Sequence, residues 1–159
     1  ERRTPPAGSR AIAEWEAAAA LAPVTPGYRF SRPHTFDEAQ VRAFALAAGD
    51  ENPLHHDAAF AQGTRFGGLI ASATHTTSLL MGLTASHFAA KGKVLGMDFS
   101  VDLLRPVRAS ETVLIEWCVT SMAAHSKGGC VLELQGAIKS ADDRTSVLAQ
   151  GTVLFTPAA

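Results

Sequence analysis

Residues 66–90 contain no Asp, Glu, Lys or Arg, and this uncharged run limits the possible folds more than any other feature. A membrane-spanning helix needs about 20 predominantly apolar residues, whereas this run also holds His75, His87 and several Thr, Ser and Gly residues. We therefore expect a buried helix over 72–89, with Ser72 as its N-cap. Because its large apolar side chains fall on more than one side, we predict that it is covered nearly all round. These side chains are Leu79, Leu80, Met81, Leu83 and Phe88.

The hydrophobic period changes from 3.6 to 2 after this helix. Apolar residues alternate with more polar ones in four stretches, over 95–103, 113–120, 132–138 and 147–155. Such alternation is typical of strands with one buried face. The segments between the stretches contain Pro, Gly and Asp, which favour turns. We predict an α+β fold in which a curved antiparallel sheet wraps the long central helix.

An amphipathic helix is expected earlier in the chain, over 37–48. Its apolar residues recur at helical spacing, and either Thr35 or Asp37 can cap its first turn. Gly49 then ends it, because glycine adopts the backbone conformation that terminates helices.

The rest of the N-terminal half supplies smaller elements. We expect a short strand at 28–30 and a short helix at 57–62 that Asp57 caps. Residues 1–27 are expected to form an arm, whose polar, Pro-rich start is disordered and whose Ala-rich part forms a short helix. Residues 28–159 then form one domain.

Composition excludes several classes of partner. The formal net charge of −1 at pH 7 argues against nucleic acid, which needs a basic face, and against an anionic membrane surface. The two cysteines, Cys118 and Cys130, have neither CxxC spacing nor His neighbours at metal-ligand spacing. We expect no metal site and no disulfide framework, and hence a cytoplasmic protein.

The polar loop at 49–55, Gly-Asp-Glu-Asn-Pro-Leu-His, is the best candidate for chemistry. Asp50 and His55 lie five residues apart in a loop that Pro53 stiffens. A carboxylate and an imidazole can hold one water and exchange protons with it, and the Asn52 amide can orient either group. From spacing alone, the commoner explanation of Asp50 is a turn or capping residue, so both explanations stay open here.

The loop continues into Phe-Gly-Gly-Leu-Ile-Ala-Ser at 66–72, directly before the buried helix. The first turn of a helix has backbone N–H groups without partners and a partial positive charge. Donors of this kind stabilise an oxyanion. The helix start is therefore a candidate site for a thioester carbonyl.

Residues 44–73, FALAAGDENPLHHDAAFAQGTRFGGLIASA, resemble the hydratase-2 motif of MaoC-like dehydratases and (R)-specific enoyl-CoA hydratases. The matching positions are Gly49, Asp50, Asn52, Pro53, Leu54 and His55. The Leu-Arg-Pro-Val segment at 104–107 is similar to that family's strand end, so the resemblance spans about 28–157. Two positions depart from the pattern. Ala73 replaces a frequent Gly but keeps its N–H, and Ser110-Glu111 replaces a usual Gly-Asp in a structural turn.

The resemblance implies a hot-dog fold that dimerises, with a dimer of dimers or a hexamer as larger options, and an acyl chain beside the central helix. Asp50 and His55 would activate a water that adds to C3 of a trans-2-enoyl thioester. A proton would go to C2, giving the (R)-3-hydroxyacyl thioester in fatty-acid metabolism. No cofactor is implied, since coenzyme A or an acyl carrier is part of the substrate. The substrate- and oxyanion-binding residues would be Asn52, Gly68, Ser72 and Ala73.

Two other functions compete with this one. A hot-dog thioesterase would hydrolyse the thioester, but the Asp-x-Asn-Pro-x-His pattern argues against it. A non-catalytic acyl-binding subunit of a heteromeric dehydratase would need neither Asp50 nor His55. Acyl chain length, the carrier and the metabolic pathway stay open.

Other side chains receive structural or binding roles. We expect His56 at the surface and His75 in the core rather than in catalysis. If the carrier is coenzyme A, its phosphates would meet basic residues at the tunnel mouth. The candidates are Arg65, Lys91, Lys93, Arg105 and Arg108.

Overall fold

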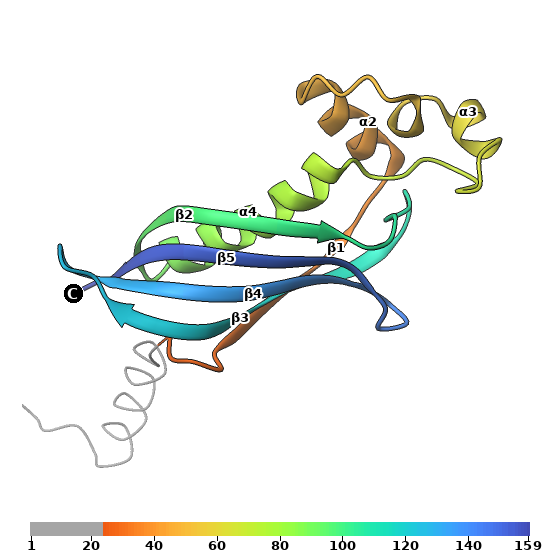
Figure 1. The fold of residues 1–159 in the computed structure, drawn as a ribbon. Coiled ribbons are helices and arrows are strands. Elements are labelled where there is room, and N and C mark those ends of the chain that lie inside the picture. Colours follow the sequence, from red (N-terminus) through yellow and green to blue (C-terminus); the bar gives the residue numbers. More distant parts are fainter. Residues whose placement is uncertain (1–23) are drawn as a thin grey trace, which may run out of the picture.

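A computed structural model describes residues 24–159 of the chain (Figure 1). The arm predicted over 1–27 therefore lies almost wholly outside the described residues. Within 24–159, no helix is both long and apolar enough to cross a membrane. The elements in chain order are β1 (Arg29–Thr35), α2 (Glu38–Ala47), the 3₁₀ turn η1 (Pro53–His55), α3 (Ala58–Gln62), α4 (Ala73–Ala89), β2 (Gly92–Leu103), β3 (Thr112–Ala124), β4 (Cys130–Ser140) and β5 (Thr145–Pro157).

The five strands form one antiparallel sheet in the order β1-β3-β4-β5-β2. Figure 1 shows α4 lying along one face of this sheet, while α2 and α3 project beyond one end of it. The α+β prediction of a long helix followed by four long antiparallel strands is confirmed. β1 and β2 are the edge strands, so each has one side without a strand partner among the described residues.

The contact between α4 and the sheet forms the centre of the core. Trp117 of β3 is 1% exposed, and its Nε1 donates a hydrogen bond to the Leu80 carbonyl of α4 over 2.9 Å. Its indole ring lies so close to Gly136 that a Cβ there would come within 2.6 Å of it. A buried indole with a satisfied N–H fixes α4 on the sheet.

The prediction that α4 is covered nearly all round is wrong for the single chain. Its buried side chains form one stripe, from His75 through Leu80 and Leu83 to Phe88. The opposite stripe is exposed, and Met81 on it is 41% exposed. The sheet contacts only one side of α4, because the other side has no element of the described chain to pack against.

β1 is longer than the short strand expected at 28–30. It pairs with β3 from Arg29 opposite Cys118 to Thr35 opposite Thr112. Its sequence lacks a regular alternation, because only Phe30 is buried within it. Pro33 is tolerated since an edge strand needs hydrogen bonds on one side only.

The predicted helix starts are confirmed by their capping contacts. Asp37 accepts a hydrogen bond from the Gln40 N–H, Asp57 from the Phe60 N–H and Ser72 from the His75 N–H. Of the two residues proposed to cap α2, Asp37 therefore does so.

Candidate active site

After the end of α2 the chain turns at Gly49, so that Asp50 packs against the last turn of α2. Gly49 adopts a left-handed φ of +72°, which glycine tolerates without the steric cost of a side chain. The Asp50 N–H then donates to the Ala45 carbonyl over 2.8 Å. After it, Asn52 caps η1 by accepting from the Leu54 N–H over 3.1 Å. This tight path folds the loop so that its first and last residues meet.

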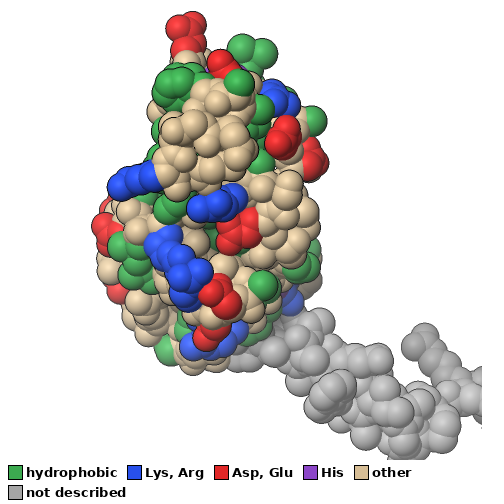
Figure 2. Space-filling model, turned by 90° about the vertical axis from the view of Figure 1, so that its right-hand side faces the viewer, with side chains coloured by type: hydrophobic (Ala, Val, Ile, Leu, Met, Phe, Trp, Pro, Cys, Tyr) green, Lys and Arg blue, Asp and Glu red, His purple; other side chains and the backbone are tan. Residues whose placement is uncertain are grey.

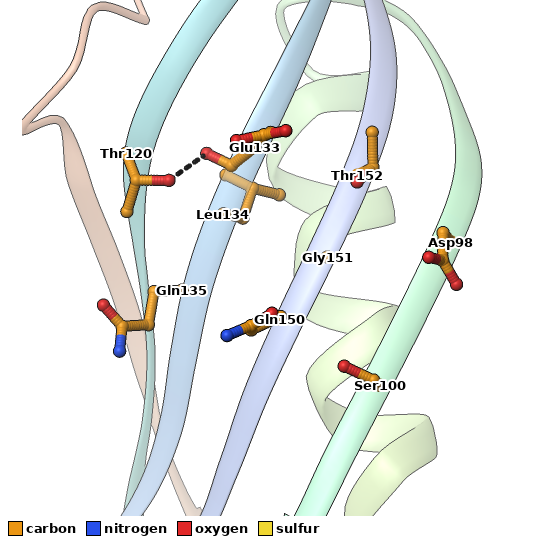
Figure 3. A pocket seen from close by; sticks show the side chains of 9 residues that line it. All are labelled: Asp98, Ser100, Thr120, Glu133, Leu134, Gln135, Gln150, Gly151 and Thr152. Carbon is orange, nitrogen blue, oxygen red and sulfur yellow. Dashed lines mark hydrogen bonds between the residues drawn. The ribbon is translucent and has the colours of Figure 1, made fainter.

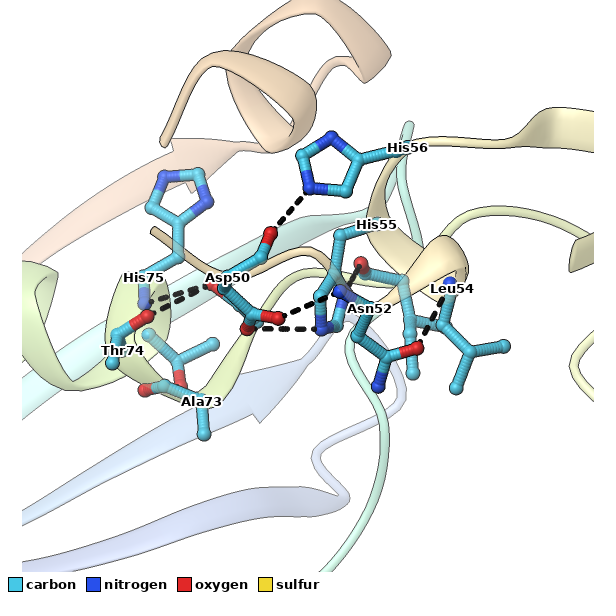
Figure 4. Close-up of polar contacts among 11 residues, drawn as sticks. Asp50, Asn52, Leu54, His55, His56, Ala73, Thr74 and His75 are labelled. Atoms are coloured by element: carbon cyan, nitrogen blue, oxygen red, sulfur yellow. Dashed lines mark hydrogen bonds and ion pairs between the residues drawn. The ribbon is translucent and has the colours of Figure 1, made fainter. Parts of the chain in front are cut away.

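The Asp50 carboxylate and the His55 imidazole face each other in this loop (Figure 4). Asp50 Oδ2 lies 3.5 Å from His55 Nε2. The His55 side chain is 8% exposed and that of Asp50 is 32% exposed. The pair thus joins a buried imidazole to a carboxylate that solvent or substrate can reach.

A backbone carbonyl determines which nitrogen of His55 carries a proton. His55 Nδ1 lies 2.7 Å from the Ile70 carbonyl oxygen. A carbonyl can only accept a hydrogen bond, so Nδ1 must donate. In the neutral imidazole Nε2 then has a free lone pair directed toward Asp50. The pair is therefore suited to accept protons from a molecule that touches both groups.

His56 holds the backbone of Asp50 from the other side. Its Nε2 donates to the Asp50 carbonyl oxygen, and its own carbonyl accepts from Arg42 Nε over 3.0 Å. On the side-chain side, Asp50 Oδ1 accepts from the Asn52 N–H over 3.0 Å. The surface role expected for His56 is wrong, because the residue is half-buried and holds the backbone of Asp50. Sequence offered no signal for this contact beyond adjacency to His55.

The start of α4 lies beside this pair, and Figure 4 draws Ala73, Thr74 and His75 next to Asp50 and His55. The Ser72 hydroxyl accepts from the His75 N–H over 3.3 Å and lies 3.1 Å from the Thr74 hydroxyl. The N–H groups of Ala73 and Thr74 belong to the first turn and have no partner within the helix. They are free to donate to a ligand.

The segment before α4 is held by backbone contacts. Gly67 has a left-handed φ of +68°, which allows the turn that leads into α4. Gly68, which was predicted to contact substrate, is half-buried in this turn. The next residues pair with the loop after β2, since the Ala71 N–H donates to the Val107 carbonyl over 2.8 Å.

His75 occupies the core position predicted for it, but its polar atoms are not all satisfied. Its ring stacks on Phe44 at 4.4 Å between centroids and meets Phe36 edge-on. Nδ1 is buried and has no hydrogen-bond partner among residues 24–159. Burial, and next the neighbouring His34, lower the pKa of His75 below 6.5. The imidazole is therefore held neutral beside the helix start.

Two further features lie apart from the pair. A hollow of about 300 Å³ on the outer face of the sheet is lined by polar side chains such as Asp98, Glu133 and Gln150 (Figure 3). It contains neither Asp50 nor His55. Within 24–159, no three His, Cys, Asp or Glu side chains gather as metal ligands would.

Comparisons with known proteins point to one family. The model of the MaoC-like domain matches residues 20–140. The (R)-specific enoyl-CoA hydratase of Aeromonas caviae is 39% identical over 88 residues, 55% of this chain and 64% of that protein. The match thus spans less than two thirds of that relative's length.

Solved structures agree on the fold. The (R)-hydratase from A. caviae involved in PHA biosynthesis superposes with a TM-score of 0.73 at 28% identity, covering 82% of this chain and 96% of that one. The unliganded R-hydratase from Pseudomonas aeruginosa superposes with a TM-score of 0.76 at 20% identity, covering 86% and 85%. At that lower identity, the second likeness concerns the fold alone.

Proposed function

Since the chain belongs to the MaoC-like domain family and has the hot-dog fold of the R-hydratases, we propose that it hydrates trans-2-enoyl thioesters reversibly to (R)-3-hydroxyacyl thioesters. The observation that carries this proposal is the 3.5 Å approach of Asp50 to His55 Nε2. It is supported by the name of the A. caviae relative, an (R)-specific enoyl-CoA hydratase.

The proposed reaction uses one water at the pair. The water donates one hydrogen bond to Asp50 Oδ2 and one to His55 Nε2, and its oxygen lone pair faces C3 of the enoyl group. The oxygen adds to C3, one of its protons passes to the pair, and a proton from the pair goes to C2. Dehydration runs the same steps backwards. General acid–base groups typically contribute 10²- to 10⁴-fold to such a reaction.

The thioester oxygen gains negative charge when water adds, and the start of α4 supports its stabilisation. The Ala73 and Thr74 N–H groups are the donors, and the partial positive charge of the helix N-terminus assists them. The Ser72 hydroxyl shapes this end of the helix as its cap. Asn52 and Gly68 complete the substrate contacts in this proposal.

We also propose that two copies of the chain pair through β2. Three of its side chains are strongly exposed: Leu95 at 68%, Met97 at 55% and Leu103 at 56%. The exposed stripe of α4 lies next to this strand, because α4 packs against β2. A long apolar edge strand is a liability in a monomer, and a second copy would cover both surfaces.

Crotonyl-CoA tests the proposed function directly. The purified chain should lower the absorbance of the enoyl-thioester band without releasing thiol. Asp50→Asn and His55→Gln should each reduce turnover by roughly 10²-fold or more, with an unchanged circular dichroism spectrum. Asp57→Asn is the matched control, because Asn also caps helices and Asp57 lies outside the pair.

Three outcomes would contradict the proposal. Thiol release would assign the chain as a thioesterase. A folded chain inert on enoyl thioesters of every length would make it a non-catalytic subunit. Near wild-type turnover in Asp50→Asn would remove the pair from the mechanism.

A further inference from the structure

A second polar hollow, of about 410 Å³, lies between the loop after β2 and the turn that joins β4 to β5. We propose that its arginines bind the phosphate groups of a nucleotide-bearing thioester carrier, namely coenzyme A. This inference rests on the proposed function and adds the place where the carrier is recognised.

The hollow presents guanidinium groups from two separate segments. Arg105 and Arg108 come from the loop after β2, and Arg144 comes from the β4–β5 turn. Figure 2 looks onto this end of the molecule and shows Lys and Arg side chains gathered across the middle of the face. Arginine is well suited to phosphate, because its planar fork can donate two parallel hydrogen bonds to neighbouring oxygens.

The two acids of the hollow already have partners. Asp142 lies 2.5 Å from Arg144 Nε and accepts from the Ser140 hydroxyl. Glu111 accepts from the Arg108 backbone N–H over 2.9 Å. The guanidinium groups of Arg105 and Arg108 have no ion-pair partner within residues 24–159. Two cations thus remain available to an anionic ligand.

Backbone contacts connect the hollow to the catalytic pair. Arg108 lies opposite Ile70 in an antiparallel bridge, and the Ala109 N–H donates to the Leu69 carbonyl over 2.9 Å. Ile70 is the residue whose carbonyl accepts from His55 Nδ1. The Arg108 guanidinium also lies over Gly67, where no side chain obstructs it. The segment Leu69–Ile70 therefore contacts His55 on one side and the loop that lines the hollow on the other.

Five basic residues are candidates from the sequence for contacting the phosphates of coenzyme A, and the geometry of the hollow favours two of them. Arg105 and Arg108 share the hollow and the backbone link to the site. Lys91 and Lys93 lie beyond the far end of α4. Arg65 stacks on Phe66 at 4.9 Å instead of lining the hollow.

The test compares two substrates that differ only in the carrier. Crotonyl-CoA carries the nucleotide phosphates, and crotonyl-N-acetylcysteamine lacks them. The double variant Arg105→Gln/Arg108→Gln should raise KM for crotonyl-CoA roughly 10-fold or more, as expected when hydrogen bonds to a charged group are lost. Its kcat, and both constants for the truncated substrate, should stay unchanged. Arg29→Gln, an exposed arginine on β1, removes the same charge outside the hollow and should leave KM unchanged.

Direct binding keeps the inference testable without turnover. Adenosine 3′,5′-bisphosphate should bind the wild-type chain in calorimetry, and the double variant should weaken this binding by a similar factor. An unchanged KM with unchanged binding would overturn the inference. So would a KM defect only for crotonyl-loaded acyl carrier protein, which would assign the hollow to a protein carrier. Absence of hydration of either substrate by the wild-type chain would instead count against the proposed function.

Discussion

The two ring nitrogens of His55 face different partners. Nδ1 donates to the Ile70 carbonyl, which leaves Nε2 facing Asp50 as an acceptor. Asp50 is fixed at its N–H, its carbonyl and one carboxylate oxygen, so only Oδ2 points to His55. Preorganised groups of this kind need little rearrangement during the reaction.

The contact from His56 to Asp50 gives a prediction at the residue scale. His56→Leu removes the donor to the Asp50 carbonyl, so the carboxylate should lose its fixed orientation. We expect kcat to fall roughly 10-fold with KM nearly unchanged, since small displacements of catalytic groups cost up to about 10²-fold. His56→Gln, whose amide can donate, should retain more of the turnover. Equal turnover in both variants and the wild type would leave His56 with a packing role only.

The sequence could predict the two residues of the pair, but not the groups that hold them in place by hydrogen bonds. Asp50 and His55 stand out because a carboxylate and an imidazole occupy one polar loop. The Ile70 carbonyl could not be found in this way, because every residue carries one. His56 was misplaced since its partner is a backbone atom, which η1 brings within reach only after the chain has folded.

At the scale of elements, the sequence predicted features that depend on residues close in the chain, but not those that depend on residues far along it. The three caps, Asp37, Asp57 and Ser72, contact N–H groups three residues later, so sequence contains the whole interaction. The extent of β1 depends on β3, whose partner residues lie far along the chain. No periodicity within β1 could have marked its end.

The cap of α4 can be tested by stability. Ser72 is fully buried and accepts from the His75 N–H. Ser72→Ala should lower the free energy of unfolding by about 1 kcal/mol, the usual cost of losing an N-cap side chain. Ser72→Thr, which keeps the hydroxyl, is the matched control. Guanidinium unfolding should show a lower midpoint with an unchanged slope for Ala, and equal midpoints for Ala and Thr would remove the cap's contribution.

At the scale of the whole molecule, two histidines make stability depend on pH. His87 Nε2 and the Tyr28 hydroxyl share a hydrogen bond of 2.8 Å, and the His87 ring stacks on Phe30 at 4.1 Å between centroids. Burial, then Lys91 and Arg32, lower its pKa below 6.5. The pKa of His75 is lowered as well. Both imidazoles are therefore held neutral in the folded chain.

The resulting prediction has a definite sign. Below pH 6.5 the unfolded chain binds protons at these histidines more readily than the folded chain, so stability is full above that pH and falls below it. Tm should therefore decrease between pH 7.5 and pH 5.5. His87→Gln removes one titrating group, so its decrease should be smaller than that of the wild type. An equal decrease in both would exclude His87 as a source of the pH dependence.

The exposed stripe of α4 and the apolar edge of β2 lie next to each other, so one partner could cover both. Sequence predicted an α4 covered on all sides, and the single chain covers one. The prediction would hold in an assembly, because a second copy seated on β2 would also approach the exposed stripe. A hydrophobic pattern predicts which side chains are buried, but it does not show whether they are buried within one chain or against a second copy.

Light scattering should accordingly give twice the chain mass at micromolar concentration. Leu95→Lys with Met97→Lys places two like charges on the edge of each copy, facing the same pair in the other. We expect this variant to be monomeric, because edge charges prevent strand pairing. Leu114→Lys with Met122→Lys is the matched control, since these residues are 38% and 44% exposed on β3, which β4 and β5 separate from β2. A wild-type monomer, or a dimer that survives the β2 charges, would show that the two apolar surfaces are not covered through β2. The stripe on α4 would then need a different chain as its partner.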